Sequence, residues 1–281
     1  MSSPSLAERL ARVVHDRLRG SMEITRALLE EVTRALASAG STEDALNTAE
    51  EFVRVASQRR SMPMLANALR VMLRHAEEGM SPGEAASRTL SELEARVESS
   101  IEVLVRLLRG ARAVMTYSYS SHVVRALRRL SPETAYVPIS CPLHEGVRTA
   151  EELRSFGLNA VSVLDTDAVR ALGWCEALVL GSDAVLRDGS VANRSGSRAL
   201  AEQADRLGLR VCFLTDLLKY DLEGTWEGER LTFMGRELEL FDLTPPLSNV
   251  LTVSSMGALR PSEFAAACDR ALKGSASRRG S

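Results

Sequence analysis

The spacing of apolar residues changes once along the chain, near Gly110. Before that point apolar side chains recur at helical spacing, as they do through residues 6–18 and 24–36. The segment Ser81–Glu84 joins a capping serine, a proline suited to a first turn and a glutamate that can reach back to the cap. It therefore predicts the start of a helix that runs to about Leu108.

After Gly110 short β-rich runs alternate with helical stretches. These runs are Ala111–Thr116, Ala135–Ile139, Asn159–Val163, Ala177–Leu180, Arg210–Leu214 and Asn249–Val253. The rhythm predicts a parallel sheet with right-handed crossovers, and the continuous apolar strands are typical of a sheet buried on both faces. The sequence thus predicts an α/β protein with an all-helical N-terminal domain (1–110), a Rossmann-like parallel-sheet domain (111–272) and a flexible tail (273–281).

The loops that follow these strands are polar and rich in Gly, Ser and Asp. They are Tyr117–Ser121, Ser140–Arg148, Asp165–Asp167, Gly181–Ser195, Thr215–Asp221 and Ser254–Gly257. Because the carboxyl ends of parallel strands meet at one edge of a sheet, this edge is the predicted ligand site.

An anionic ligand suits the residues of that edge. Hydroxyl groups are abundant there, and Arg148, Arg194 and Lys219 supply positive charge. Backbone amides around Gly189 and Gly196 could point at an anion near the start of a helix. These features favour a phosphorylated small molecule, with Lys219 among its binding residues.

Composition narrows the alternatives. The formal net charge is −2 and the pI about 6.2, so bulk charge suggests neither a nucleic-acid nor a membrane partner. The chain shows no secretory pattern and no membrane-length apolar run, which predicts a cytoplasmic protein. No cysteine pair has metal-ligand spacing, and no GxGxxG or GxxxxGK[ST] motif occurs, so neither metal nor cofactor is expected. Cys141, in a loop after a strand, is the one cysteine placed for reactivity.

Several segments together resemble one known family. The stretch GSDAVLRDGSVANRSGS at residues 181–197 is similar to the signature shared by the alpha, beta and delta subunits of translation initiation factor 2B and by the isomerases of ribose-1,5-bisphosphate and methylthioribose-1-phosphate. Further matches, in the same order, are Arg19-Gly20-Ser21, Asn67-Ala68-Leu69, Thr116–Ser120 and Phe241–Pro246. By this order and spacing the chain is identified as a member of that family.

The resemblance implies a set of site residues. It makes Asp183 the family acid. It also places Arg194 where the family loop has lysine, and an arginine can still bind a phosphate. Arg19 and Arg59 would reach the cleft from the helical domain, and Ser118 would line it. The implied ligand-binding residues are Arg19, Gly20, Ser21, Arg59, Asn193 and Arg194.

Ser118 stands where the ribose-1,5-bisphosphate isomerases, by this resemblance, carry a catalytic cysteine. Moving a proton between sugar carbons needs a group whose pKa lies near the working pH, and an unassisted serine hydroxyl is far too weak an acid. Serine could act only with a base, for which His122 is the nearest candidate. The isomerases also carry Glu-x-Arg-Pro where this chain has Ile139–Pro142. The serine form of the loop is similar to the initiation-factor subunits.

Two hypotheses of different class follow. In the first, the protein is a non-catalytic regulatory-subunit-like protein that binds a phosphorylated metabolite or nucleotide. The resemblance then implies homodimers or mixed oligomers of related subunits, assembled through the C-terminal domain, and a translation GTPase as a further partner. In the second it is an aldose–ketose isomerase of a phosphorylated pentose, an intramolecular oxidoreductase that retains Asp183. Ser118 favours the first hypothesis and leaves the question of enzymatic activity open.

Overall fold

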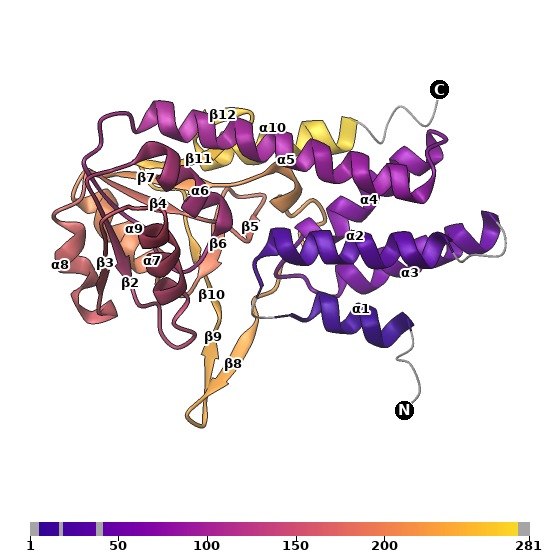
Figure 1. Ribbon diagram of the computed structural model, residues 1–281, viewed down its shortest axis with the longest axis horizontal. Coiled ribbons are helices and arrows are strands. Elements are labelled where there is room, and N and C mark those ends of the chain that lie inside the picture. The colour runs from indigo at the N-terminus through magenta and orange to yellow at the C-terminus, as the bar shows by residue number, and fades with distance from the viewer. Residues whose placement is uncertain (1–5, 17–18, 38–41, 275–281) are drawn as a thin grey trace. The chain divides into compact units, whose positions relative to one another are not determined.

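The computed structural model describes residues 6–16, 19–37 and 42–274 (Figure 1). The chain forms two compact units, Met1–Ala95 and Arg96–Ser281. Most of the predicted tail, residues 275–281, lies outside the described residues.

The described part of the N-terminal unit contains helices and no strand, as the apolar spacing predicted. These helices are α1 (Leu6–Val14), α2 (Ser21–Ala37), α3 (Thr42–Ser57), α4 (Met64–Glu77) and the first part of α5 (Pro82–Leu107). The predicted cap of α5 is present, because the Ser81 amide donates to Glu84 Oε2 at 2.9 Å and the Glu84 amide donates to Ser81 Oγ at 3.4 Å.

The second half of α5 belongs to the C-terminal unit. Arg96 Nε lies 2.9 Å from Asp216 Oδ2, and the Leu107 carbonyl accepts a hydrogen bond from Arg210 Nη1 at 2.8 Å. These bonds connect the second half of the helix to the loop after β7 and to the residue Arg210. The two units therefore divide inside α5, earlier in the chain than Gly110, where the apolar spacing changes.

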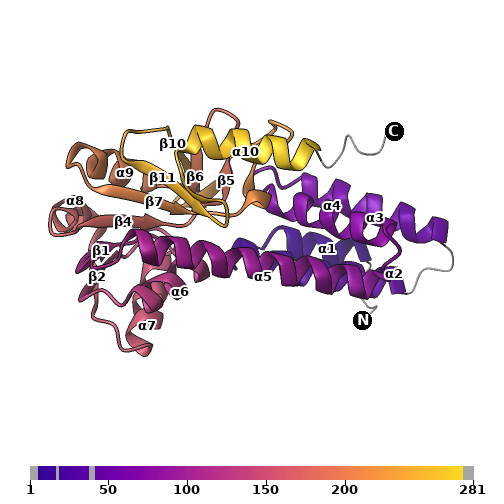
Figure 2. The same ribbon diagram turned by 90° about the horizontal axis from the view of Figure 1, so that it is seen from above.

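A seven-stranded sheet forms the centre of the C-terminal unit, in the order β12-β11-β7-β4-β1-β2-β3 (Figure 2). All neighbours are parallel except β12, which runs antiparallel to β11. All six predicted β-rich runs form strands of this sheet. The strands are β1 (Ala113–Met115), β2 (Thr134–Pro138), β3 (Ala160–Val163), β4 (Ala177–Leu180), β7 (Arg210–Leu214), β11 (Val250–Ser254) and β12 (Gly257–Leu259).

Helices cover both faces of this sheet. Figure 2 shows α6 and α7 on one face and α9 and α10 on the other. The helices after α5 are α6 (Ser121–Leu130), α7 (Glu145–Ser155), α8 (Ala168–Leu172), α9 (Ser197–Arg206) and α10 (Pro261–Gly274). Residues of β4 and β7 are fully buried between the two layers, among them Leu178 and Phe213. This burial explains why the central strands read as continuous apolar runs.

Two smaller antiparallel sheets were not predicted. The segment 181–195, expected to be a loop, contains β5 (Ala184–Val185) and β6 (Val191–Arg194), which join β10 (Phe241–Thr244) in a three-stranded sheet. These strands are short, and polar residues interrupt β6 and β10, so neither forms a continuous apolar run. Strands β8 (Arg230–Phe233) and β9 (Arg236–Glu239) form a separate hairpin that projects from the unit (Figure 1).

Candidate functional site at the carboxyl edge of the sheet

The loops after neighbouring parallel strands meet at the carboxyl edge, as predicted. Gly181, directly after β4, lies so close to the loop after β1 that a Cβ added to it would stand 2.9 Å from Ser120 Cβ. Any larger residue at 181 would push these two loops apart, so the glycine permits the close approach.

Ser118 is buried and fixed by the loop after β2. Its amide donates to Ser140 Oγ at 2.9 Å, and its carbonyl accepts from Thr149 Oγ1 at 2.7 Å. Its own hydroxyl donates to Glu145 Oε2 at 2.6 Å. The hydroxyl proton of Ser118 therefore points to Glu145 and not to His122, the nearest candidate base in the sequence.

Glu145 also binds Arg194. Its Oε1 lies 3.1 Å from Arg194 Nε and 2.9 Å from Arg194 Nη2. The Arg194 guanidinium carbon lies 4.9 Å from the centre of the Phe241 ring, which places the cation over an aromatic face. Arg194 Nη1 is buried and has no hydrogen-bond partner among the described residues. Ser118, Glu145 and Arg194 thus form a continuous polar chain with one donor group unused.

Sequence reasoning missed Glu145 as a site residue. It lies inside the predicted site loop 140–148, but an acid in the first turn of a helix reads as a solvated charge or a helix-dipole partner. The signal available was its place, since α7 begins directly after the loop that follows β2.

A small cavity adjoins this polar chain. Its volume is about 20 Å³, which is room for about one water molecule. The base of the β8–β9 hairpin forms one wall and the loop after β2 forms another. The lining residues are Tyr117, Ser140, Cys141, Pro142, Leu143, Glu145, Arg194, Ser195, Leu231, Leu238, Glu239 and Leu240.

A second charged cluster lies in the loops after β4 and β7. Lys219 is 3% exposed, and its Nζ donates to the Ser182 carbonyl. Burial lowers the pKa of Lys219, while the charges of Asp183 and Asp216 oppose that shift. Two predicted site residues, Asp183 and Lys219, are therefore close in space, and Lys219 has little access to solvent.

His122, at the start of α6, is also buried in this cluster. Burial, followed by the charges of Lys219 and Arg125, lowers the pKa of His122 well below its ordinary value. Its Nε2 has no hydrogen-bond partner among the described residues. The imidazole is neutral at neutral pH and does not contribute a positive charge to the site.

The start of α9 already holds an anion that belongs to the protein. Asp242 Oδ2 accepts hydrogen bonds from the Gly196 amide at 2.7 Å and the Arg198 amide at 3.2 Å, and burial raises the pKa of Asp242 to about 6. The Gly189 amide donates to the Leu186 carbonyl. The prediction that these amides bind an external anion is therefore wrong, because internal acceptors occupy them.

Asn193 is turned toward the same helix. Its Nδ2 donates to Ser197 Oγ at 2.9 Å, and its backbone pairs with that of Asp242 between β6 and β10. The side chain of Asn193 is buried, so the Asn193-Arg194 pair sends one member to the helix start and the other to Glu145.

Two of the predicted phosphate residues of the N-terminal unit, Arg19 and Arg59, both bond to Asp16. Arg19 Nε lies 2.7 Å from Asp16 Oδ2, and Arg59 Nη1 donates to the Asp16 carbonyl at 2.7 Å. The Gly20 amide donates to a carboxylate oxygen of Glu23 at 3.0 Å, and Ser21 is buried at the start of α2. Within this unit the distant motifs meet, while their role as ligands stays a prediction.

Cys141 is exposed but does not resemble an activated thiol. Its amide donates to Asp165 Oδ2 at 2.8 Å, and burial together with the Asp165 carboxylate raises the pKa of Cys141. A raised pKa favours the protonated thiol, which is less reactive than a thiolate. Among the described residues no cluster of His, Cys, Asp and Glu could hold a metal ion, and no helix is long and apolar enough to cross a membrane.

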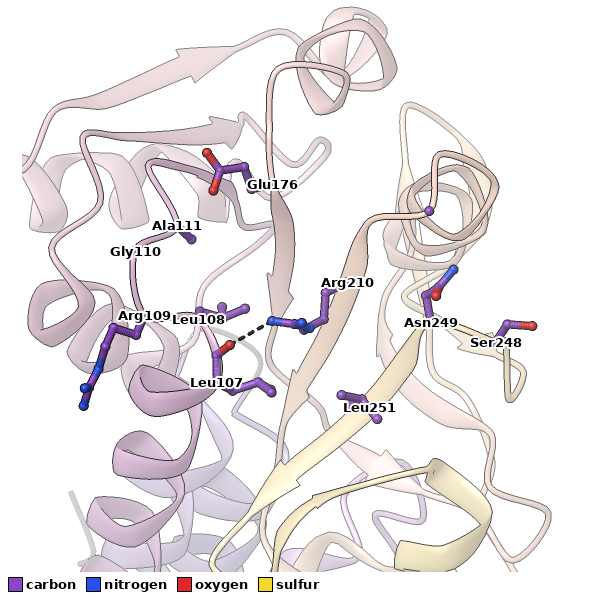
Figure 3. Close-up of a pocket in the computed structure, with 11 residues that line it drawn as sticks. Leu107, Leu108, Arg109, Gly110, Ala111, Glu176, Arg210, Ser248, Asn249 and Leu251 are labelled. Atoms are coloured by element: carbon purple, nitrogen blue, oxygen red, sulfur yellow. Dashed lines mark hydrogen bonds between the residues drawn. The ribbon is translucent and has the colours of Figure 1, made fainter.

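A larger cavity lies at the opposite, amino-terminal edge of the sheet (Figure 3). Its volume is about 500 Å³, and none of the predicted site residues lines it. Figure 3 shows Arg210 bonded to the Leu107 carbonyl across this space. The lining residues are Leu107, Leu108, Arg109, Gly110, Ala111, Glu176, Gly208, Arg210, Ser248, Asn249 and Leu251.

Comparison with known proteins agrees with the resemblance. Residues 17–241 match the Initiation factor 2 subunit family. The ribose 1,5-bisphosphate isomerase of Haloferax volcanii is 26% identical over 70% of this chain and 70% of its own length. Methylthioribose-1-phosphate isomerases also match, and the chain spans about half (47%) of the length of those from Aspergillus fumigatus.

Solved structures share the fold. The translation initiation factor eIF-2B of Pyrococcus horikoshii OT3 aligns with a TM-score of 0.78 at 20% identity, over 93% of this chain and 99% of its own. A subunit of the tetrameric eIF2B-beta2-delta2 complex from C. thermophilum aligns with a TM-score of 0.68 at 15% identity, over 94% of each chain. At these identities the likeness concerns the fold alone.

Proposed function

Because the chain belongs to the Initiation factor 2 subunit family, we propose that it is a non-catalytic binding subunit similar to the regulatory subunits of initiation factor 2B. Its C-terminal unit binds a phosphorylated small molecule at the carboxyl edge of the sheet. The same unit joins it to a second copy or to related subunits, and a translation GTPase is the proposed further partner. The tetrameric assembly named for one structural relative supports the oligomeric part of this proposal.

The hydrogen bond from Ser118 to Glu145 is the observation that carries the non-catalytic assignment. Where a thiol would be needed, the chain has a hydroxyl whose oxygen lies 2.6 Å from a carboxylate oxygen and donates a hydrogen bond to it. A carboxylate, with an ordinary pKa of about 4.3, does not remove a proton from an alcohol to a useful extent. Held in this way, Ser118 does not take over the role of a thiol that exchanges protons at neutral pH.

An isomerase assay tests this assignment. We expect no appreciable turnover of ribose-1,5-bisphosphate or methylthioribose-1-phosphate, since loss of a positioned acid or base alone lowers the rate by about 10²–10⁴-fold. Ser118→Cys restores the thiol without the other lost contacts, so it should give at most trace activity. Robust turnover by the natural protein that disappears in Asp183→Asn would overturn the assignment.

A ligand screen tests the binding role. We expect pentose phosphates, nucleoside monophosphates or hexose phosphates to raise the melting temperature, and neutral sugars not to. Arg194→Gln should reduce that shift, because Arg194 is a partly accessible cation of the site. A shift that is equal in the natural protein and the variant would remove Arg194 from the proposed ligand set.

The isomerase of a phosphorylated pentose stays as the second candidate. The family acid, Asp183, is retained close to Lys219, and sequence relatives carry isomerase names. In that case the enzyme would be an intramolecular oxidoreductase, and the assay above separates the two candidates.

A further inference from the structure

Glu145 contacts two of the residues expected to face a ligand. One carboxylate oxygen accepts the Ser118 hydroxyl at 2.6 Å, and the other lies 2.9 Å from Arg194 Nη2. The side chains of Glu145 and Arg194 are 19% and 12% exposed, and both line the small cavity beside the hairpin. The negative charge nearest to Arg194 is therefore supplied by the protein.

Arg194 retains binding capacity in spite of this ion pair. Its Nε and Nη2 face Glu145, whereas its buried Nη1 has no hydrogen-bond partner among the described residues. A guanidinium presents five donors in a planar fork, and its unused side matches the oxygens of a phosphate. A buried donor without a partner is unfavourable, so this atom marks a position where an acceptor would be stabilised.

Glu145 can leave without unfolding its helix. It is the first residue of α7, and its side chain makes its hydrogen bonds to the loop after β1 and to β6 rather than within α7. Because it is partly exposed, rotation about its side-chain bonds would bring the carboxylate into solvent. The backbone of α7 would stay in place, held by the hydrogen bond that the Gly146 amide donates to the Ile139 carbonyl at 3.1 Å.

We propose that Glu145 is an internal counter-ion that competes with the phosphate group of the ligand for Arg194. This inference rests on the proposed phosphate-binding function of the same site. A phosphate bound to Arg194 would lie beside the Glu145 carboxylate, and the two negative charges would repel each other. A ligand therefore binds when the carboxylate turns away. This competition lowers the affinity of the site for every anion. It favours those anions whose charge and contacts are sufficient to displace a carboxylate.

The competition can be measured with inorganic phosphate as the probe. We expect Glu145→Gln to bind inorganic phosphate about tenfold or more tightly than the natural protein, measured by calorimetry and by thermal shift. Glutamine keeps the shape and the acceptor oxygen for Ser118 but removes the charge. Glu151→Gln is the matched control, because it removes one charge from the exposed side of the same helix and should leave phosphate affinity unchanged.

Two further variants tie the effect to its partners. In the double variant Glu145→Gln/Arg194→Gln the gain in phosphate affinity should disappear, because the guanidinium that would bind the phosphate is absent. Ser118→Ala removes one of the bonds that hold the carboxylate, so we expect a smaller gain, of about two- to fivefold. This milder variant keeps the proposal testable if Glu145→Gln folds poorly, which unfolding without ligand would reveal.

The outcomes separate the two levels of the proposal. If the natural protein binds phosphate, Arg194→Gln abolishes binding and Glu145→Gln leaves it unchanged or weaker, the counter-ion role is wrong while the binding function stands. If neither the natural protein nor Glu145→Gln binds phosphate or any phosphorylated compound of the screen, both are wrong. An equal gain in Glu151→Gln would also overturn the counter-ion role, because it would show a general charge effect.

Discussion

Two acid–cation clusters occupy the same edge of one sheet, and they differ in what they leave unused. Around Arg194, the side chains of Arg194 and Glu145 are 12% and 19% exposed and line a cavity. Around Lys219, the ammonium group is buried and Asp216 is 2% exposed. Residues of the same types, all following or flanking strands of one sheet, thus stand in different environments.

The difference indicates separate roles. Asp216 bonds Arg96 at 2.9 Å and the Leu218 amide at 2.9 Å, so its carboxylate joins α5 to the loop after β7. Lys219 donates to a backbone carbonyl of the loop after β4. Buried charged groups that bond to other parts of the protein, such as Asp216 and Lys219, hold loops together. A partly exposed ion pair with an unused donor, such as Glu145 and Arg194, can respond to a ligand.

The largest effect is expected from Asp216→Asn. Removing the charge deprives Arg96 of its carboxylate partner and Lys219 of one of the two carboxylates near it, in a buried setting, which should lower the free energy of unfolding by about 3–5 kcal/mol. Urea unfolding of the natural and variant proteins measures this. A loss below about 1 kcal/mol would mean that this cluster is not structural, and the distinction between the two clusters would fail.

A pH-dependent effect of similar order is expected at Asp242. Burial raises the pKa of Asp242 to about 6 in the folded protein, above its ordinary value of 3.8. The folded state then binds this proton more tightly than the unfolded chain does. Stability from this group is therefore present below about pH 4 and is lost as the pH rises through about 6.

Comparison with Asp242→Asn isolates that dependence. Relative to the variant, which keeps an acceptor oxygen for the Gly196 amide, the natural protein should gain up to about 2–3 kcal/mol as the pH falls from 7 to 4. Denaturant titrations at several pH values give the difference directly. Parallel stability curves for the two proteins would show that Asp242 ionises normally and would contradict the expectation.

Lys219→Met sharpens the comparison, because Lys219 was predicted from the sequence to bind ligand. Methionine fills a similar volume but leaves the Ser182 carbonyl without its donor, which should lower the free energy of unfolding by about 1–3 kcal/mol. Phosphate affinity should stay unchanged in the folded variant. Loss of phosphate binding without loss of stability would instead assign Lys219 to the ligand.

Particular residues show how far the sequence predicts this structure. Ala177–Leu180 and Arg210–Leu214 form strands with the predicted bounds, because continuous apolar runs between helices have few other solutions. β6 and β10 escaped prediction because neither strand is apolar along its length. Their pairing places Asn193 opposite Asp242 and Arg194 opposite Phe241. These residues are far apart in the chain, so no local sequence pattern could predict the pairing.

The sequence predicted the location of the site but not the hydrogen bonds and ion pairs within it. Loop positions alone located Ser118 and Arg194 at one edge, since parallel strands end together. The partner of both, Glu145, depends on the rotation of α7 about its axis, which tertiary packing sets. The same limit hid Asp242, whose carboxylate fills the helix start that the loop composition offered to an external anion.

The smallest effect on stability is expected from Glu145→Gln, and it tests the comparison most directly. The substitution is the same carboxylate-to-amide type of change as Asp216→Asn, at the same edge of the sheet. Because the Glu145 pair is partly exposed and glutamine still accepts a hydrogen bond from Ser118, the free energy of unfolding should change by less than about 1 kcal/mol. Urea unfolding of both variants under one set of conditions gives the ratio of the two effects. Equal losses of about 3 kcal/mol or more would show that Glu145 is as structural as Asp216, and the Arg194 cluster would then have no separate role in binding.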